Sequence, residues 1–116
     1  MSDTHTTVTE LREMVRDFVN QRDWQQFHAP KNISMALSIE AAELMEHFQW
    51  LTLEASRAIR DDETAKQAIG EELADVVCYA LALANELDLD LSNAMQAKME
   101  KNRQKYPADK YKGRYE

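Results

Sequence analysis

Hydrophobic residues recur every three to four positions along most of the chain, which is the spacing of one face of an α-helix. The repeat predicts three long helices at about 8–22, 33–51 and 63–87. A fourth is expected to begin near Ser92 and to end before Pro107, and the stretch 52–62 has room for a short helix. The pattern therefore predicts an all-α fold.

The ends of these helices carry capping residues and a break. Thr9 and Ser92 are the expected N-caps of the first and last helices, because a short hydroxyl side chain can bond a free amide of the first turn. Residues 22–32 interrupt the repeat and contain Pro30, so we expect an ordered loop there. Loops often carry sites, and this one holds two aromatic residues and His28.

Each of the two central helices has an apolar stripe that is expected to face the core. In the second helix the stripe consists of Leu37, Ala41, Leu44, Phe48 and Leu51. In the third helix it consists of Leu73, Val76, Val77, Ala80 and Leu87. A second stripe runs beside each of these, and it contains the acidic residues discussed below.

Composition agrees with a helical chain of one domain, residues 1–116. Only 2 Gly and 2 Pro occur in 116 residues, which disfavours a β-sandwich or barrel. Gly70 and Gly113 are the only glycines, so a Gly-rich phosphate loop and a dinucleotide fingerprint are excluded. We expect a protomer of four to five helices, with residues 1–7 and 108–116 flexible.

Charge is distributed unevenly. Residues 98–116 carry seven Lys and Arg and three acidic residues, a local charge of +4. Because the net charge of the chain is −7, residues 1–97 carry a charge of −11. Such a chain is a poor candidate for binding a nucleic-acid polymer, although its basic segment can bind a compact anion such as a triphosphate. Cys78 has no intramolecular disulfide partner, and neither a membrane span nor a signal sequence is recognisable, so we expect a cytoplasmic location.

Two acidic pairs, Glu40 with Glu43 and Glu72 with Asp75, carry the clearest chemical signal. Residues three apart lie on one face of a helix about one turn apart, so each pair directs two carboxylates to nearly the same point. Four oxygen donors brought together suit a hard cation such as Mg²⁺. The alternative is that both pairs are solvated surface acids, which are common on amphipathic helices.

Other candidate residues also have two interpretations. Trp24, Trp50 and Tyr79 are either core aromatics or a slot in which a nucleobase stacks. Lys98, like the other cations of the last helix, either complements the helix dipole or binds phosphate together with Asn102.

Five segments resemble the MazG-like, all-α nucleoside triphosphate pyrophosphohydrolases, in particular the dCTP pyrophosphatase branch. They are Arg22-Asp-Trp-Gln-Gln-Phe-His28, Pro30-Lys-Asn32, Glu40-x-x-Glu43 followed by Phe48-Gln-Trp50, Glu71-Glu-Leu-Ala-Asp-Val76 with Tyr79, and Lys98-Met-x-x-Asn102-Arg-x-x-Tyr106-Pro107. In order and spacing they cover about 22–107, and it is the series rather than any one motif that is specific.

The resemblance implies a helical bundle completed by oligomerisation, as a homodimer or homotetramer. It also implies Mg²⁺-dependent cleavage between the α- and β-phosphates of a nucleoside triphosphate, with Mn²⁺ as a substitute. By the same resemblance, the catalytic metal ligands are Glu40, Glu43, Glu72 and Asp75. Lys98 and Asn102 match positions that contact phosphate or sugar, and the nucleoside pocket corresponds to Trp24, His28, Trp50 and Tyr79.

The expected activity is hydrolysis of dCTP or a modified pyrimidine deoxynucleotide to monophosphate and pyrophosphate, which cleanses the nucleotide pool. We expect direct attack by water oriented by Glu43, since no Ser, Thr or Cys nucleophile lies within the motifs. Two rivals remain: a nucleotide-binding or sensing module that does not hydrolyse, and a helical interaction protein whose acids are solvated. A phosphohydrolase acting on another phosphate ester is a further alternative within the enzyme class.

Overall fold

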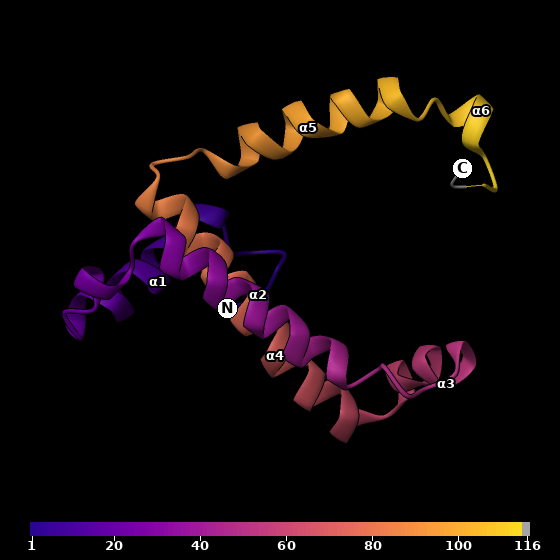
Figure 1. Ribbon diagram of the computed structural model, residues 1–116, viewed down its shortest axis with the longest axis horizontal. Helices are drawn as coiled ribbons and strands as arrows, with labels where there is room; N and C mark the ends of the chain where they lie inside the picture. Colours follow the sequence, from indigo (N-terminus) through magenta and orange to yellow (C-terminus); the bar gives the residue numbers. More distant parts are fainter. Residues whose placement is uncertain (115–116) are drawn as a thin grey trace.

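The computed structural model describes residues 1–114, and within them every regular element is helical (Figure 1). The prediction of an all-α fold is therefore confirmed. The four long helices are α1 (Val8–Gln21), α2 (Pro30–Glu46), α4 (Glu63–Glu86) and α5 (Leu91–Lys105). The short elements are η1 (Gln25–Phe27), α3 (Leu53–Ala58), η2 (Ile59–Asp61) and α6 (Ala108–Tyr111).

The helix starts differ from the predicted ones in their capping residues. The hydroxyl of Thr7 accepts a hydrogen bond from the Glu10 amide at 3.1 Å, and the carboxylate of Asp90 accepts one from the Asn93 amide at 2.9 Å. Both capping residues have extended backbones, which lets the side chain turn back to the first turn. The predictions of Thr9 and Ser92 were wrong, because both residues lie inside the helices.

The loop predicted at 22–32 is shorter than expected. It contains η1, and α2 begins at Pro30 because a proline at the first helical position loses no hydrogen bond and has the required φ. At its other end α2 stops at Glu46 rather than at residue 51, and a turn follows. The short helix expected within 52–62 is present as α3.

The C-terminal tail is also more regular than predicted. Residues from Ala108 were expected to be irregular, but they form the single turn α6, whose Tyr111 ring meets that of Tyr106 edge to face at 5.3 Å. The flexibility predicted for 1–7 and 108–116 stays a prediction, and residues 115–116 lie outside the described part of the chain.

The core lies where α2 and α1 pack against α4 (Figure 1). Its buried apolar side chains are Val19, Ile33, Leu81, Ala82 and Ala84. They cluster around the start of α2, the end of α1 and the second half of α4. No helix within residues 1–114 is long and apolar enough to cross a membrane.

A single chain leaves much of its surface unburied. Its accessible area is 9447 Å², whereas a globular monomer of 13.4 kDa exposes roughly 6,500 Å². The radius of gyration is 17.1 Å, against about 13 Å for a compact domain of this length. Helix α5 contributes to this extension, because it runs apart from the α2–α4 pair (Figure 1).

The apolar stripe of α4 is only partly buried, contrary to expectation. Leu73 is 50% exposed and Val77 is 43% exposed. Within one chain α4 is covered mainly by α1 and α2, and the face of α4 that meets α2 carries Glu72 instead. The apolar stripe therefore remains available for contact with another surface.

Candidate metal centre

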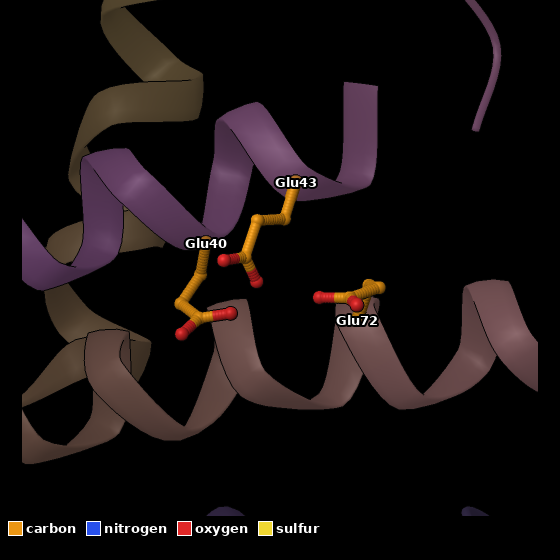
Figure 2. A group of neighbouring side chains, drawn as sticks. All are labelled: Glu40, Glu43 and Glu72. Carbon is orange, nitrogen blue, oxygen red and sulfur yellow. The ribbon is translucent and has the colours of Figure 1, made fainter. Parts of the chain in front are cut away.

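Three of the four predicted carboxylates meet between α2 and α4. Glu40 and Glu43 extend from α2 toward α4, and Glu72 extends from α4 toward them (Figure 2). One carboxylate oxygen of each residue lies within 4.8 Å of those of the other two. Helical spacing of three places the first two side chains on one face, and the packing of α2 on α4 adds the third.

Two oxygens of this group have no partner. Oε2 of Glu40 and Oε2 of Glu72 are buried and make no hydrogen bond within the described residues. A buried polar atom left without a partner costs free energy, so such atoms in a folded protein call for an explanation. A cation between the two helices would satisfy both oxygens at once.

The electrostatics of the group agree with this explanation. Loss of solvation raises the pKa of Glu40, and the Glu43 carboxyl raises it further through direct interaction and charge. Partial burial likewise raises the pKa of Glu72, followed by the charges of Glu43 and Asp75, while His47 acts in the opposite direction. The pKa of each carboxyl is therefore raised first by lost solvation and then by the neighbouring carboxylates.

Asp75, the fourth predicted ligand, lies at the edge of the site. It is exposed and is not one of the three mutually close carboxylates among residues 1–114. Its charge nevertheless raises the pKa of both Glu40 and Glu72. Its role as a metal ligand stays a prediction.

The donor set fits a hard divalent cation. All three members of the group are carboxylates, and oxygen ligands are those that Mg²⁺ and similar ions prefer. Mg²⁺ usually keeps several waters and takes only a few protein carboxylates together with substrate phosphates. Glu40, Glu43 and Glu72 would therefore hold such an ion with room left for a phosphate.

The predicted nucleoside-binding aromatics do not form one slot within a single chain. Trp24 precedes η1 and packs edge to face on Phe18, with ring centroids 5.7 Å apart. Trp50 lies in the turn after α2 and is 88% exposed, so the described residues leave it largely uncovered. His28 ends η1 and Tyr79 lies on α4, and both are half-buried.

The predicted phosphate-binding residues lie on α5, away from the carboxylates. Lys98 is exposed, and the Asn102 carboxamide contacts Met99 Sδ at 3.9 Å. Because α5 runs apart from the α2–α4 pair in Figure 1, a single chain does not bring these side chains to the metal centre.

A pocket between α1, η1 and the second half of α4 was not predicted. The sequence predicts no site residue before position 22, and His28 is the one predicted site residue that lines the pocket. The remaining lining residues are Val15, Arg16, Val19, Asn20, Gln25, Ala82, Asn85 and Glu86. The acidic residues were recognised because they are polar side chains beside an apolar stripe. The same pattern occurs in α1, where Arg16 follows Val15 and Asn20 follows Val19, and it could have indicated this pocket.

Comparison with known proteins places the chain in a family. Residues 35–116 match the model of the MazG-like family. The chain is similar to dCTP pyrophosphatase 1 of Mus musculus, with 41% identity over 109 residues, and to that of Homo sapiens, with 40% identity over 102 residues. The chain belongs to the MazG-like family, and the resemblance seen in its sequence is confirmed.

The matches differ in how much of each relative they cover. The alignment takes in 92% of this chain but 63% of the mouse protein, and 88% against 60% for the human one. The chain thus spans under two thirds of the length of these relatives. The crystal structure of a pyrophosphatase from Archaeoglobus fulgidus is matched over 98% of its length and 92% of this chain, with a TM-score of 0.77 and 36% identity.

Proposed function

We propose that the protein is a Mg²⁺-dependent nucleoside triphosphate pyrophosphohydrolase that converts dCTP or a modified pyrimidine deoxynucleotide to monophosphate and pyrophosphate. The observation that carries the proposal is the group of three carboxylates between α2 and α4, with two buried oxygens that lack a partner. Membership of the MazG-like family and similarity to proteins named dCTP pyrophosphatase 1 support it.

In this reaction the carboxylates position the phosphates and the attacking water. Mg²⁺ held by these carboxylates would neutralise the triphosphate and stabilise the charge that develops at phosphorus. Glu40, Glu43 and Glu72 would hold the ion between the two helices, and Glu43 would also orient a water molecule and accept its proton. The water oxygen bonds to the α-phosphorus, the bond to the α–β bridging oxygen breaks, and the pyrophosphate leaves with that oxygen.

We further propose that the active form is a homodimer or homotetramer in which a second copy supplies Lys98 and Asn102. These residues lie on α5, which does not reach the carboxylates of its own chain. The basic segment 98–116 and the acidic remainder of the chain are complementary in charge. The exposed apolar side chains of α4 provide the area for such an interface.

The single free thiol of Cys78 suits a reducing compartment, so we place this activity in the cytoplasm. There the role would be removal of surplus or damaged pyrimidine nucleotides. Neither membranes nor nucleic-acid polymers are needed as partners.

A pyrophosphate-release assay tests the reaction directly. Purified protein is incubated with standard and modified nucleoside triphosphates, with Mg²⁺ or with EDTA. Equal amounts of pyrophosphate and monophosphate, formed only with the metal, are expected. Orthophosphate as the product would indicate another phosphohydrolase, and nucleotide binding without turnover would favour the sensing module.

Replacing Glu43 tests the assigned chemistry. Glu43→Gln removes a negative ligand and the proton acceptor, so kcat/KM should fall at least about 100-fold while the far-UV circular dichroism stays helical. The matched control is Glu46→Gln, one turn further along α2 at an exposed position outside the group, which should stay within about twofold of wild type. Full activity of Glu43→Gln would disprove the mechanism.

A further inference from the structure

The C-terminal end of the chain forms a small cluster of aromatic and cationic side chains that the proposed function does not use. Pro107 cannot continue a helix, so α5 ends at Lys105 and α6 begins directly after the proline (Figure 1). The Tyr111 amide donates to the Pro107 carbonyl at 3.0 Å and closes the turn. The turn brings the Tyr111 ring back to the end of α5, where it meets Tyr106.

One ring contact and two cation contacts fix the order of this cluster. The rings of Tyr106 and Tyr111 meet edge to face, with centroids 5.3 Å apart and planes at 83°. The Lys105 ammonium lies 5.3 Å from the centroid of Tyr106, and the Arg114 guanidinium lies 5.7 Å from that of Tyr111. A cation at such a distance is attracted to the negative face of an aromatic ring. We call these four residues the C-terminal cluster.

Lys105 is oriented by the cluster, but its charge is not neutralised there. Its side chain is exposed and makes no ion pair with an acidic residue among residues 1–114. Arg103 on the same helix differs, because it is paired with Glu100 at 3.2 Å. The ammonium group of Lys105 therefore retains N–H donors for an anion outside its own chain.

Lys105 also shares a side of α5 with the two residues that are proposed to contact the substrate. Asn102 and Lys105 follow Lys98 by four and seven residues, a spacing that keeps all three on one side of the helix. Lys98 and Lys105 are separated by a rise of about 10 Å, and long lysine side chains can converge on one ligand from that separation. A triphosphate whose nucleoside end lies at Lys98 extends its terminal phosphates toward Lys105.

We propose that Lys105 binds the terminal phosphates of the substrate, which leave as pyrophosphate, and that Tyr111 positions Lys105 through the Tyr106 ring. The inference rests on the proposed function, in which a second copy supplies α5 to the carboxylates. A lysine ammonium binds phosphate oxygens as a compact charge with several donors. Helix α6 would then serve the active site, because its turn places the ring that supports Lys105.

The two reaction products test Lys105 separately, because only pyrophosphate carries the terminal phosphates. Lys105→Ala should raise the inhibition constant of pyrophosphate about tenfold, since a charge-assisted hydrogen bond is lost, and should raise KM for dCTP similarly. The inhibition constant of deoxycytidine monophosphate should stay within about twofold of wild type. An equal change for both products, or an unchanged KM for dCTP, would overturn the proposal.

The matched control for this charge is Lys110→Ala. It removes one positive charge from an exposed position on α6 that makes no contact within the C-terminal cluster. Both inhibition constants should equal those of wild type. A tenfold weaker inhibition by pyrophosphate in this variant too would show that only the overall charge of the segment matters.

Two substitutions of Tyr111 test its positioning role. Tyr111→Ala removes the ring that meets Tyr106 and should raise the inhibition constant of pyrophosphate about threefold, with no change for the monophosphate. Tyr111→Phe keeps the ring and should restore the wild-type value. Equal pyrophosphate inhibition of the two variants would contradict the positioning role.

Titration calorimetry with Mg²⁺ and pyrophosphate separates this inference from the proposed function, because it requires no turnover. If wild type binds pyrophosphate about tenfold more tightly than Lys105→Ala but hydrolyses no triphosphate, the anion site is supported and the proposed activity fails. If dCTP is hydrolysed but both proteins bind pyrophosphate equally, the activity stands and the assignment of Lys105 is wrong.

Discussion

Glu40 and Glu72 are the residues at which folding and chemistry conflict. Each of the two residues has one buried carboxylate oxygen without a hydrogen-bond partner among residues 1–114, and the pKa of both carboxyls is raised above the ordinary value of 4.5 by burial and by neighbouring carboxylates. A protein selected for stability alone would place uncharged side chains there. A cation removes the conflict, which is why this arrangement supports a metal centre.

The raised pKa of Glu72 predicts how stability depends on pH in the absence of metal. The folded state binds this proton more tightly than the unfolded chain, so the stabilisation is complete below 4.5 and is lost as pH rises through the folded pKa. Glu72→Gln removes this loss. In EDTA at neutral pH the variant should therefore melt at a higher temperature than wild type, and the difference should vanish in mildly acidic buffer.

Addition of Mg²⁺ should reverse the order of the melting temperatures, so that wild type melts above Glu72→Gln. An ion held by the ionised carboxylates would stabilise wild type by about 2.7 kcal/mol at 100 times its dissociation constant, whereas Glu72→Gln should gain less. Thermal denaturation with and without the metal measures both effects. Equal stabilisation of wild type and variant would show that Glu72 does not hold the ion.

At the level of the helices, one arginine joins α1 to the end of α4. The Arg12 guanidinium donates to the Leu89 carbonyl at 2.6 Å and to the Ala84 carbonyl at 3.2 Å, and its Nε donates to Asn85 Oδ1 at 3.0 Å. These carbonyls lie at or just beyond the last turn of α4, where backbone acceptors lack helical partners and a cation complements the dipole. The contact sets the position of α1 beside α4, and therefore the width of the pocket between them.

Removal of this contact should destabilise the protein measurably. Arg12→Ala leaves two backbone carbonyls without their charged donor and the Asn85 oxygen with Arg16 alone, which should cost about 1.5–3 kcal/mol of unfolding free energy. The matched control is Arg16→Ala, since this more exposed residue donates only to the Asn85 oxygen, at 3.1 Å, and should cost under about 1 kcal/mol. Urea denaturation compares the two, and equal losses would contradict the role given to Arg12.

The whole molecule is more open than a self-sufficient domain of its length. Large apolar side chains remain exposed along α4, and α5 has few neighbours in its own chain. Burying this area would contribute about 25 cal/mol for each Å² of apolar surface removed from water. We therefore expect the protein to be an oligomer in solution, which light scattering would detect as a mass at least twice 13.4 kDa.

Mixing two inactive variants tests whether the sites are shared between copies. Glu43→Gln lacks a carboxylate and Lys98→Ala lacks the basic side chain, so each alone should be nearly inactive. When the two variants exchange subunits at equal concentration, about half of the symmetric dimers contain one copy of each. One of the two sites in such a dimer receives both intact residues, so about a quarter of all sites should regain activity. A mixture that stays as inactive as its components would mean that each chain builds its site alone.

Much of this protein was readable from its pattern of residues. Helical periodicity located α1, α4 and α5 within a residue or two, because amphipathic spacing is a local property of the chain. The same spacing placed Glu40 beside Glu43 and indicated which face of α4 would carry Glu72. The predictions were wrong at helix ends. In the structure Thr7 rather than Thr9 caps α1, and Pro30 begins α2 instead of lying in a loop.

Other features depended on how the helices pack. The meeting of Glu72 with the pair on α2, and the burial of two of their oxygens, arise from contact between elements that are distant in sequence. The pocket beside Asn20 and Gln25 exists only because α1 and η1 lie against α4. Local periodicity determines which side chains share a face of a helix. Long-range packing determines which faces meet, and both the carboxylate group and the pocket lie where two helices meet.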